Sequence, residues 1–384
     1  MQERGFALWQ LGFRPFYLMA AIFAAVSVGT WAAQFAGYLP YVGHTGPSWH
    51  AHELIFGYAL AVIAGFLFTI VRNWTHRSTP AGATLAGIVV LWLAARVLVH
   101  TPWSVAVAVT NVAFALAVAA GIGVPLWQSR NRRNYFFVGF LALIAAASVL
   151  FHLSALHVIA LPAWAGVQLG LDVVLLVIAA VAGRLVPIYT NNAVASASAR
   201  RSQSVEWLAM GGLFALLVAD LFALSGPASI ALVVALAVVH AWRLVLWDLR
   251  SALAVPLLWV LHLGYAWLPL HFALRAMHEA GWVARPLAVH AFTIGAIGGL
   301  TMAMMIRTAR AHTGRALKAD GYDVAGCVLL AAAATLRVFW PLIRPDHQVL
   351  ATLYSGALWS AAFALFVVRH GPALVRPRVD GRPA

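Results

Sequence analysis

The sequence is poor in charged residues and has a single cysteine, and both deficits exclude whole classes of protein. Only 9% of its 384 residues are charged, whereas 63% are hydrophobic. A soluble chain of this length could not bury so much apolar surface in one core. The lone Cys327 rules out an intramolecular disulfide and a Cys-x-x-Cys-His site for covalent haem, and we interpret it as a buried free thiol.

Long polar stretches and a clear internal repeat are also missing. The longest polar connector, roughly residues 190–204, is too short to fold alone, so we predict one transmembrane domain over residues 1–384. The apolar runs approach the length of about 20 residues that a helix needs to cross a hydrocarbon layer of about 30 Å. They are continuous rather than alternating, which favours helices over a barrel. The expected fold is an all-α polytopic membrane protein, a bundle of twelve transmembrane helices.

The twelve spans are expected near residues 15–37, 51–71, 82–100, 103–127, 135–157, 163–187, 205–224, 228–247, 252–274, 284–306, 323–341 and 348–369. The first run lacks a small-residue cleavage site, and we interpret it as a retained helix rather than a signal peptide. With the N-terminus inside, most of the 25 Lys and Arg lie on cytoplasmic loops, tails and helix ends. This positive-inside pattern predicts that both termini are cytoplasmic. It also explains the net charge of +14 without a nucleic-acid partner, which would need the charge gathered on one domain.

Histidine is unusually frequent, with 15 residues against 11 carboxylates. The stretch "WHAHELIFGYALAVIAGFLFTI", residues 49–70, places a His-x-His-Glu cluster at the mouth of an apolar span. At about 1.5 Å rise per residue, seven histidines fall in the outer half of the expected spans and His262 falls near the midplane. The seven are His50, His52, His100, His152, His157, His271 and His290. His240 lies towards the inner side, and His312 lies in a cytoplasmic loop.

Imidazoles that converge within a bilayer indicate a function, because ionisable groups there are costly. Several neutral imidazoles with few carboxylates and no thiolates suit haem or copper. His50 and His52 lie about 200° apart around an ideal helix, so we expect them to have different tasks. His50 would share a face with Glu53, for a metal ion or a proton relay, and His52 would reach a haem. For any one histidine, a hydrogen bond to a neighbouring helix is the alternative.

Other polar residues leave more than one interpretation open. Arg96, one turn below His100, would bind haem propionates or extend to lipid headgroups. Asp172 and Asp220 would join helices by hydrogen bonds or belong to a proton path. The segment "GRLVPIYTNN" indicates a structural helix break, and we expect His312 to have a structural or regulatory role.

Five segments together carry a family resemblance. They are "LGFRPFYLMAAIFAA", "WHAHELIFGYALAVIAGFLFTIVRNWT", "GRLVPIYTNN", "HLGYAWLPL" and "HAFTIGAIGGLTMAMMIRTARAHTGR". In this order they resemble the NnrS family of bacterial membrane proteins, from the first expected span to the tenth. The resemblance implies twelve spans in the inner membrane, haem and copper, and a link to nitric oxide through denitrification and resistance to nitrosative stress. It supports His50, His52, Glu53, His152, His262, His290 and His312, whereas Arg72 stands where the family motif is expected to have proline.

The resulting expectation is a protein that binds haem b non-covalently and a copper ion, surrounded by membrane lipids. The cofactor-binding residues are expected to be His52, His152, His262, His290 and Arg96, and the metal ligands His50, His52, His152, His262 and His290. Nitric oxide would bind there, and its reduction, as in an oxidoreductase, would need a quinol or cytochrome as electron donor and Glu53 to deliver protons.

Two other classes of protein remain as alternatives. A secondary transporter of a metal ion or small solute should show matched, interrupted helices in two halves, and we found no such pair in the sequence. An assembly factor for respiratory complexes would not need the histidine cluster.

Overall fold

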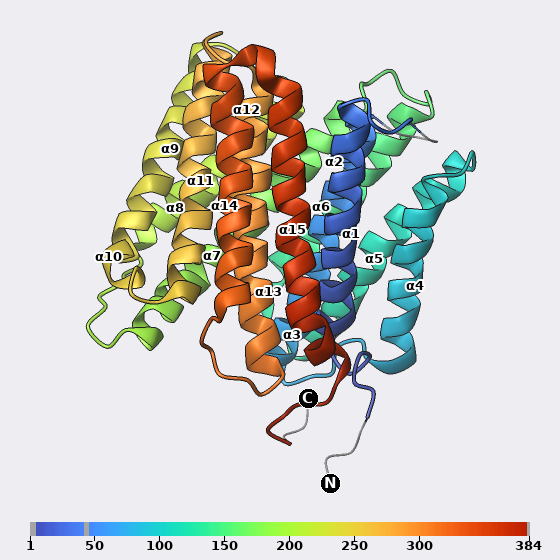
Figure 1. Ribbon diagram of the computed structural model, residues 1–384, viewed down its shortest axis with the longest axis vertical. Coiled ribbons are helices and arrows are strands. Elements are labelled where there is room, and N and C mark those ends of the chain that lie inside the picture. The colour runs from blue at the N-terminus through green and yellow to red at the C-terminus, as the bar shows by residue number, and fades with distance from the viewer. Residues whose placement is uncertain (1–4, 42–45, 382–384) are drawn as a thin grey trace. The chain divides into compact units, whose positions relative to one another are not determined.

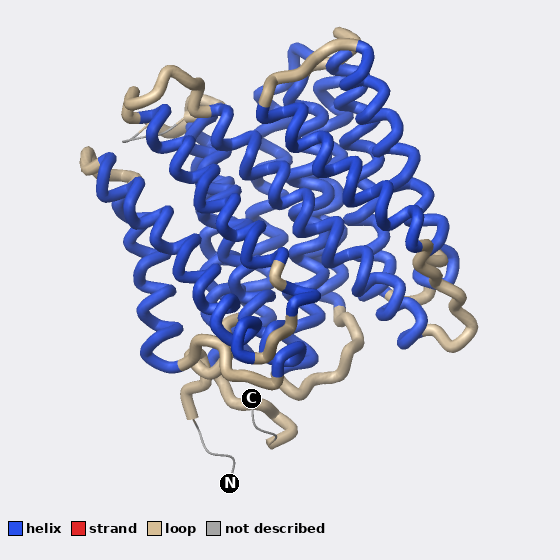
Figure 2. Tube along the Cα trace, turned by 180° about the vertical axis from the view of Figure 1, so that it is seen from behind, coloured by secondary structure: helices blue, strands red, loops and turns tan. Residues whose placement is uncertain are grey.

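The computed structural model describes residues 5–41 and 46–381, and over these residues the chain forms helices and loops without strands (Figure 2). Eleven helical segments of the described chain are long and apolar enough to cross a membrane. They include α1 (Phe13–Phe35), α5 (Ser104–Gln128), α7 (Trp164–Ala193), α8 (Gln203–Leu221), α9 (Pro227–Leu246), α11 (Pro256–Glu279) and α14 (Gly321–Ile343). The predicted all-α membrane fold is therefore confirmed.

Short elements extend the remaining spans. The 3₁₀ turn η2 (Arg132–Asn134) precedes α6 (Phe136–Ala155), and η4 (Pro345–His347) precedes α15 (Gln348–Val375). The third of the expected spans is α4 (Gly82–Leu98), which at 17 residues is shorter than the other eleven. A short helix, α10 (Leu249–Ala252), lies between α9 and α11. The count of twelve spans stays a prediction.

Two long segments share a pattern that sequence inspection did not reveal. In the first, α2 (Pro47–His52) runs into a π-helix, η1 (Glu53–Ala59), and then α3 (Leu60–Thr75). In the second, α12 (Arg285–His290) runs into the π-helix η3 (Ala291–Gly298) and then α13 (Gly299–His312). Each opens with a six-residue helix that has proline in its first turn and histidine at its end. π-Helical turns are rare and concentrate at functional sites, so both junctions are candidates for function.

The chain divides into two compact units. Unit 1 comprises residues 1–174, 308–316 and 366–384, and unit 2 comprises residues 175–307 and 317–365. In unit 1, α1 packs against α3, α3 against α5, and α5 against both α4 and α6, and α4 runs beside α5 in Figure 1. The backbone N–H of Ala7 donates to the carbonyl of Val375 over 2.9 Å, so the two described chain ends meet at one end of this unit.

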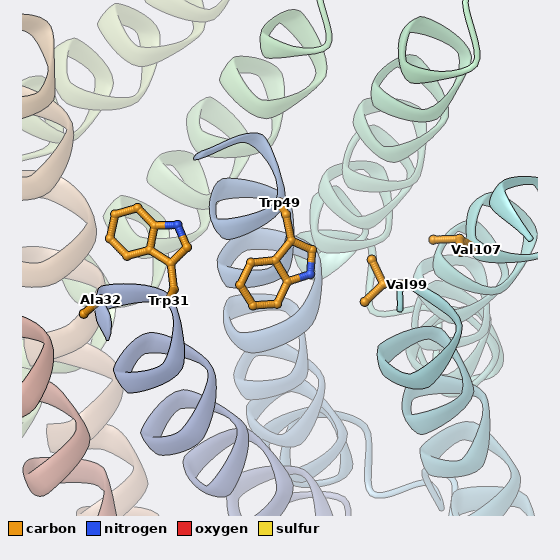
Figure 3. Close-up of a cluster of buried hydrophobic side chains, with 5 residues drawn as sticks. All are labelled: Trp31, Ala32, Trp49, Val99 and Val107. Carbon is orange, nitrogen blue, oxygen red and sulfur yellow. The ribbon is translucent and has the colours of Figure 1, made fainter. Parts of the chain in front are cut away.

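An apolar cluster joins the ends of α1 and α4 to the starts of α2 and α5 in unit 1 (Figure 3). Trp31 and Ala32 come from α1, Trp49 from α2, Val99 from the end of α4 and Val107 from α5. All five side chains are buried. Because large aromatic side chains bury much apolar surface, this cluster fixes where the first turns of α2 lie.

In unit 2, small residues let α11 approach α13 closely. A Cβ atom added to Gly264 would lie 3.0 Å from the backbone nitrogen of Leu300 and 3.2 Å from the carbonyl carbon of Gly299. Both of those atoms are backbone and cannot rotate away. Such small-residue contacts are typical of packed membrane helices.

We therefore predict that Gly264→Val separates these two helices and destabilises the protein by about 1–3 kcal/mol, the usual cost of overpacking. Thermal unfolding of the purified protein should show a lower Tm. The matched control is Gly211→Val on α8, where an added Cβ meets no atom within 4 Å. Equal Tm values for the two variants would contradict the proposed helix contact.

Candidate functional site

His52 and Glu53 lie at the junction of α2 and η1, and the two neighbouring side chains bind each other. His52 Nδ1 lies 2.8 Å from Glu53 Oε1. A carboxylate can only accept, so the Nδ1–H of His52 donates and its Nε2 carries the lone pair. Both side chains are buried, with 1% and 0% of their surfaces exposed. This carboxylate–histidine pair is the arrangement that orients imidazoles as metal ligands.

His152, in the last turn of α6, brings a second imidazole to the same place. Its Nε2 lies 3.2 Å from Nε2 of His52, and the two ring centroids are 4.9 Å apart. Because His52 presents a lone pair there, only a proton of His152 or a cation can join the two nitrogens. The structure therefore brings together two of the predicted ligand residues.

Arg96 from α4 pairs with the other oxygen of Glu53. Its Nη1 lies 3.0 Å from Glu53 Oε2, and its Nη2 donates to the side-chain oxygen of Asn111 on α5. Asn111 is held in turn by the carbonyl of Val107, 2.9 Å from its Nδ2. The buried charges of Glu53 and Arg96 thus neutralise each other, as burial in an apolar bundle requires. We call Asn111, Arg96, Glu53, His52 and His152 the unit 1 polar chain.

Gly57 in η1 makes room for this ion pair. A Cβ atom at this position would overlap Nη1 of Arg96. The Gly57 carbonyl accepts a hydrogen bond from Trp92 Nε1 over 2.9 Å, and the Trp92 ring lies under the guanidinium of Arg96. Glycine in the π-helix is therefore required for the close approach of α4.

A cavity opens beside the two histidines. Its volume is about 320 Å³, and its lining is mostly apolar. His52, His152, Trp49, Phe151 and Val107 are among the residues that line it. Volume and lining suit a small ligand with little polarity, with the imidazoles as its polar contacts.

Three other predicted site residues have different contacts. His50 does not pair with Glu53 as expected; its ring stacks on Trp31 with centroids 3.9 Å apart. In unit 2, both ring nitrogens of His262 face backbone carbonyls, 3.0 Å from Leu258 and 3.2 Å from Trp247. His290, at the end of α12 before η3, has Nδ1 2.6 Å from the carbonyl of Pro286.

Unit 2 contains a buried polar network to which the sequence pattern assigned no role. His240 on α9 has its Nδ1 2.6 Å from the hydroxyl of Tyr265, which also accepts a hydrogen bond from Arg243. Arg243 in turn binds Glu206, with 3.0 Å between Nη2 and Oε2. Nε2 of His240 is buried and has no hydrogen-bond partner among the described residues. The signal that could have revealed this network is the pair His240 and Arg243, three residues apart in an apolar helix.

A protein-family model described as "NnrS protein" matches residues 7–378. The chain belongs to the NnrS family. The match includes the last two helices, which the motif-based resemblance did not cover. None of the curated proteins matches the chain. Family membership supports a membrane protein related to nitric oxide.

The described part of this NnrS-family chain offers a metal ion few converging donors. Among residues 5–41 and 46–381, no three His, Cys, Asp or Glu side chains converge as a ready metal site. With bonds of about 2.0 Å and a tetrahedral angle, two nitrogens on one ion lie roughly 3.3 Å apart. The 3.2 Å between His52 and His152 fits that value. The pair could therefore supply two nitrogen ligands to a single metal ion.

We predict that Arg96→Leu destabilises the protein, because it breaks the unit 1 polar chain at Glu53. This change would leave the carboxylate of Glu53 buried without its cation, at a cost of about 3–5 kcal/mol. The double variant Arg96→Leu/Glu53→Gln should recover part of this loss, because no buried charge is left unpaired. Thermal or denaturant unfolding of the purified proteins gives both values.

The control is Arg344→Leu, which removes the partner of Asp346 from an exposed pair with 2.8 Å between Nη2 and Oδ2. Exposed ion pairs contribute little to stability, so this variant should unfold like the wild type. If Arg96→Leu were as stable as Arg344→Leu, the ion pair between Arg96 and Glu53 would not be required for stability.

Proposed function

We propose that this protein binds nitric oxide in the inner membrane of a bacterium, and that it holds copper in unit 1 and haem b in unit 2. The observation that carries the proposal is the Nε2–Nε2 separation of 3.2 Å between His52 and His152, next to an apolar cavity. Copper accepts imidazole ligands readily, and this pair presents two nitrogens with one tautomer already set by Glu53. Nitric oxide is small and has little polarity, so the cavity suits it.

Haem b is assigned to His290 on the surroundings of its ring. Nδ1 of His290 faces the carbonyl of Pro286, the kind of contact that directs Nε2 towards a metal. His262 suits a haem less, because both of its ring nitrogens face backbone carbonyls. When bound, haem supplies the redox chemistry, and the residues of this chain hold and orient it.

Reduction of two nitric oxide molecules to N2O and water takes two electrons and two protons. The protons would pass Glu53 and His52, whose carboxylate and Nδ1–H form a buried hydrogen bond. The electrons would come from a quinol or a cytochrome. Glu53 has a second task in this proposal, because its carboxylate orients His52 and balances Arg96.

A secondary transporter is the second candidate, and one observation favours it. The segments α2–η1–α3 and α12–η3–α13 are a matched pair, as transporters with repeats would show. Both segments, however, pass through their π-turns without an unwound stretch, and unwound backbone is what usually coordinates a transported ion. The matched pair therefore fits two cofactor-binding junctions better than two halves of a transport path.

The experiment for this proposal is copper and haem analysis of the purified protein, with optical spectra of the dithionite-reduced form before and after nitric oxide. His52→Ala and His152→Ala should each lose most of the copper and keep the haem, whereas His290→Ala should lose the haem. His100→Ala, an exposed residue at the end of α4, is the control and should keep both. Protein that contains neither copper nor haem after expression with ample supplies of both would favour the transporter.

Glu53→Gln tests the positioning task separately. Glutamine can still accept a hydrogen bond from His52 through Oε1, but it no longer carries the charge that balances Arg96. We expect copper affinity to fall about 10- to 100-fold, the usual effect of losing a partner of a metal-bound histidine. Competition with a copper chelator measures this. Unchanged affinity would remove Glu53 from the site.

A further inference from the structure

Arg14, at the start of α1, is a fully buried arginine that uses only part of its hydrogen-bonding capacity. Its Nη1 donates to the carbonyls of Leu374 over 2.9 Å and of Arg376 over 2.7 Å, at the end of α15. Its Nε and Nη2 have no hydrogen-bond partner among the described residues. Buried donors are almost always satisfied, so two that are not indicate a missing acceptor.

Further cations gather around Arg14 in unit 1. Arg315 and Arg378 lie within electrostatic range of Arg14. Arg14, Arg72 and Arg378 all lie within electrostatic range of His312. Arg310, Arg369 and Arg376 lie within range of Arg315. We call the following seven residues the arginine cluster: Arg14, Arg72, Arg310, Arg315, Arg369, Arg376 and Arg378. They come from the ends of α1, α3, α13 and α15 and from the segments that follow α13 and α15.

The part of unit 1 that the structure describes has few negative charges. The described residues of unit 1 include three carboxylates, Glu53, Asp172 and Asp380. Glu53 binds Arg96 and His52, while Asp380 binds Arg378 with 2.6 Å between Nη2 and Oδ2. Burial and the neighbouring arginines lower the pKa of Arg315, so its charged form is disfavoured in this environment.

Two ordinary roles account for only part of this arrangement. An arginine that caps the carbonyls at a helix C-terminus is common, but the cap on α15 uses Nη1 and leaves the other two nitrogens of Arg14. The positive-inside bias places arginines on the cytoplasmic side, but it does not require seven from four helix ends to converge. Like charges that converge repel one another unless an anion lies between them.

We propose that the arginine cluster binds a phosphate oxyanion, and that its source is the headgroup of an acidic phospholipid. Guanidinium groups match phosphate oxygens with paired, charge-assisted hydrogen bonds. Basic sites between helix ends on the cytoplasmic side bind such headgroups in other membrane proteins. The bound phosphate would accept hydrogen bonds from Nε and Nη2 of Arg14 and hold the end of α15 against the start of α1. This proposal is independent of the metal centre.

The experiment is a titration of the purified full-length protein in neutral detergent, with thermal unfolding as the readout. The probes are phosphatidylglycerol, phosphatidylcholine and inorganic phosphate, each at constant ionic strength. Phosphatidylglycerol should raise Tm with a saturable dependence, and phosphatidylcholine should not. Arg315→Gln/Arg376→Gln should weaken the affinity for phosphatidylglycerol roughly 30-fold, from about 1 kcal/mol per basic residue.

The matched control is Arg132→Gln/Arg133→Gln, which removes the same charge from exposed residues of η2 outside the cluster and should respond like the wild type. If the first double variant fails to fold, Arg315→Gln alone should weaken binding roughly fivefold. Stabilisation by inorganic phosphate equal to that by phosphatidylglycerol would support the phosphate site and reassign its source to free phosphate. No response to either phosphate probe, or an equal response in the cluster and control variants, overturns the proposal.

Discussion

A carboxylate buried among membrane helices has to be paired, and the arrangement of unit 1 around Glu53 follows from that requirement. No surface of Glu53 is exposed, so both of its oxygens depend on groups from the protein. Arg96 reaches one oxygen because Gly57 has no side chain, and His52 reaches the other from the adjacent position. Charge compensation thus determines the approach of α4 to η1, and it also determines which nitrogen of His52 keeps its lone pair.

Unit 2 also pairs a carboxylate with a buried arginine, but with different neighbours. Arg243 binds Glu206, and a Cβ atom on Gly183 would overlap its guanidinium, as one on Gly57 would overlap Arg96. The difference lies in what each network presents to the neighbouring histidine. Glu53 can only accept and therefore fixes the proton of His52 on Nδ1. Tyr265 can both donate and accept, so its contact with Nδ1 of His240 leaves the choice of tautomer open.

Most of the fold could be predicted from the sequence, because apolar runs of membrane length leave the backbone few alternatives to a helix. The site could be predicted only in part. Helical depth put His52, Glu53 and His152 at related levels with His262 and His290, and the structure brings the first three together. Ideal helical spacing, however, paired Glu53 with His50 instead of His52. Adjacent side chains on an ideal helix do not face each other, so spacing alone could not predict the contact between His52 and Glu53. Helical depth also placed His262 near the midplane, but it could not show that both of its ring nitrogens face backbone carbonyls.

The number of histidines in a membrane protein is therefore a weaker guide to metal binding than the partner of each ring. His52 and His240 are equally buried, yet only His52 has a partner that fixes the position of its ring proton. A lone pair next to a second imidazole and an apolar cavity is suited to a metal ion, whereas Nε2 of His240 is buried without a partner among the described residues. The partner of each ring thus decides what the ring can bind, and Glu53 leaves His52 with the lone pair that a metal ion would need.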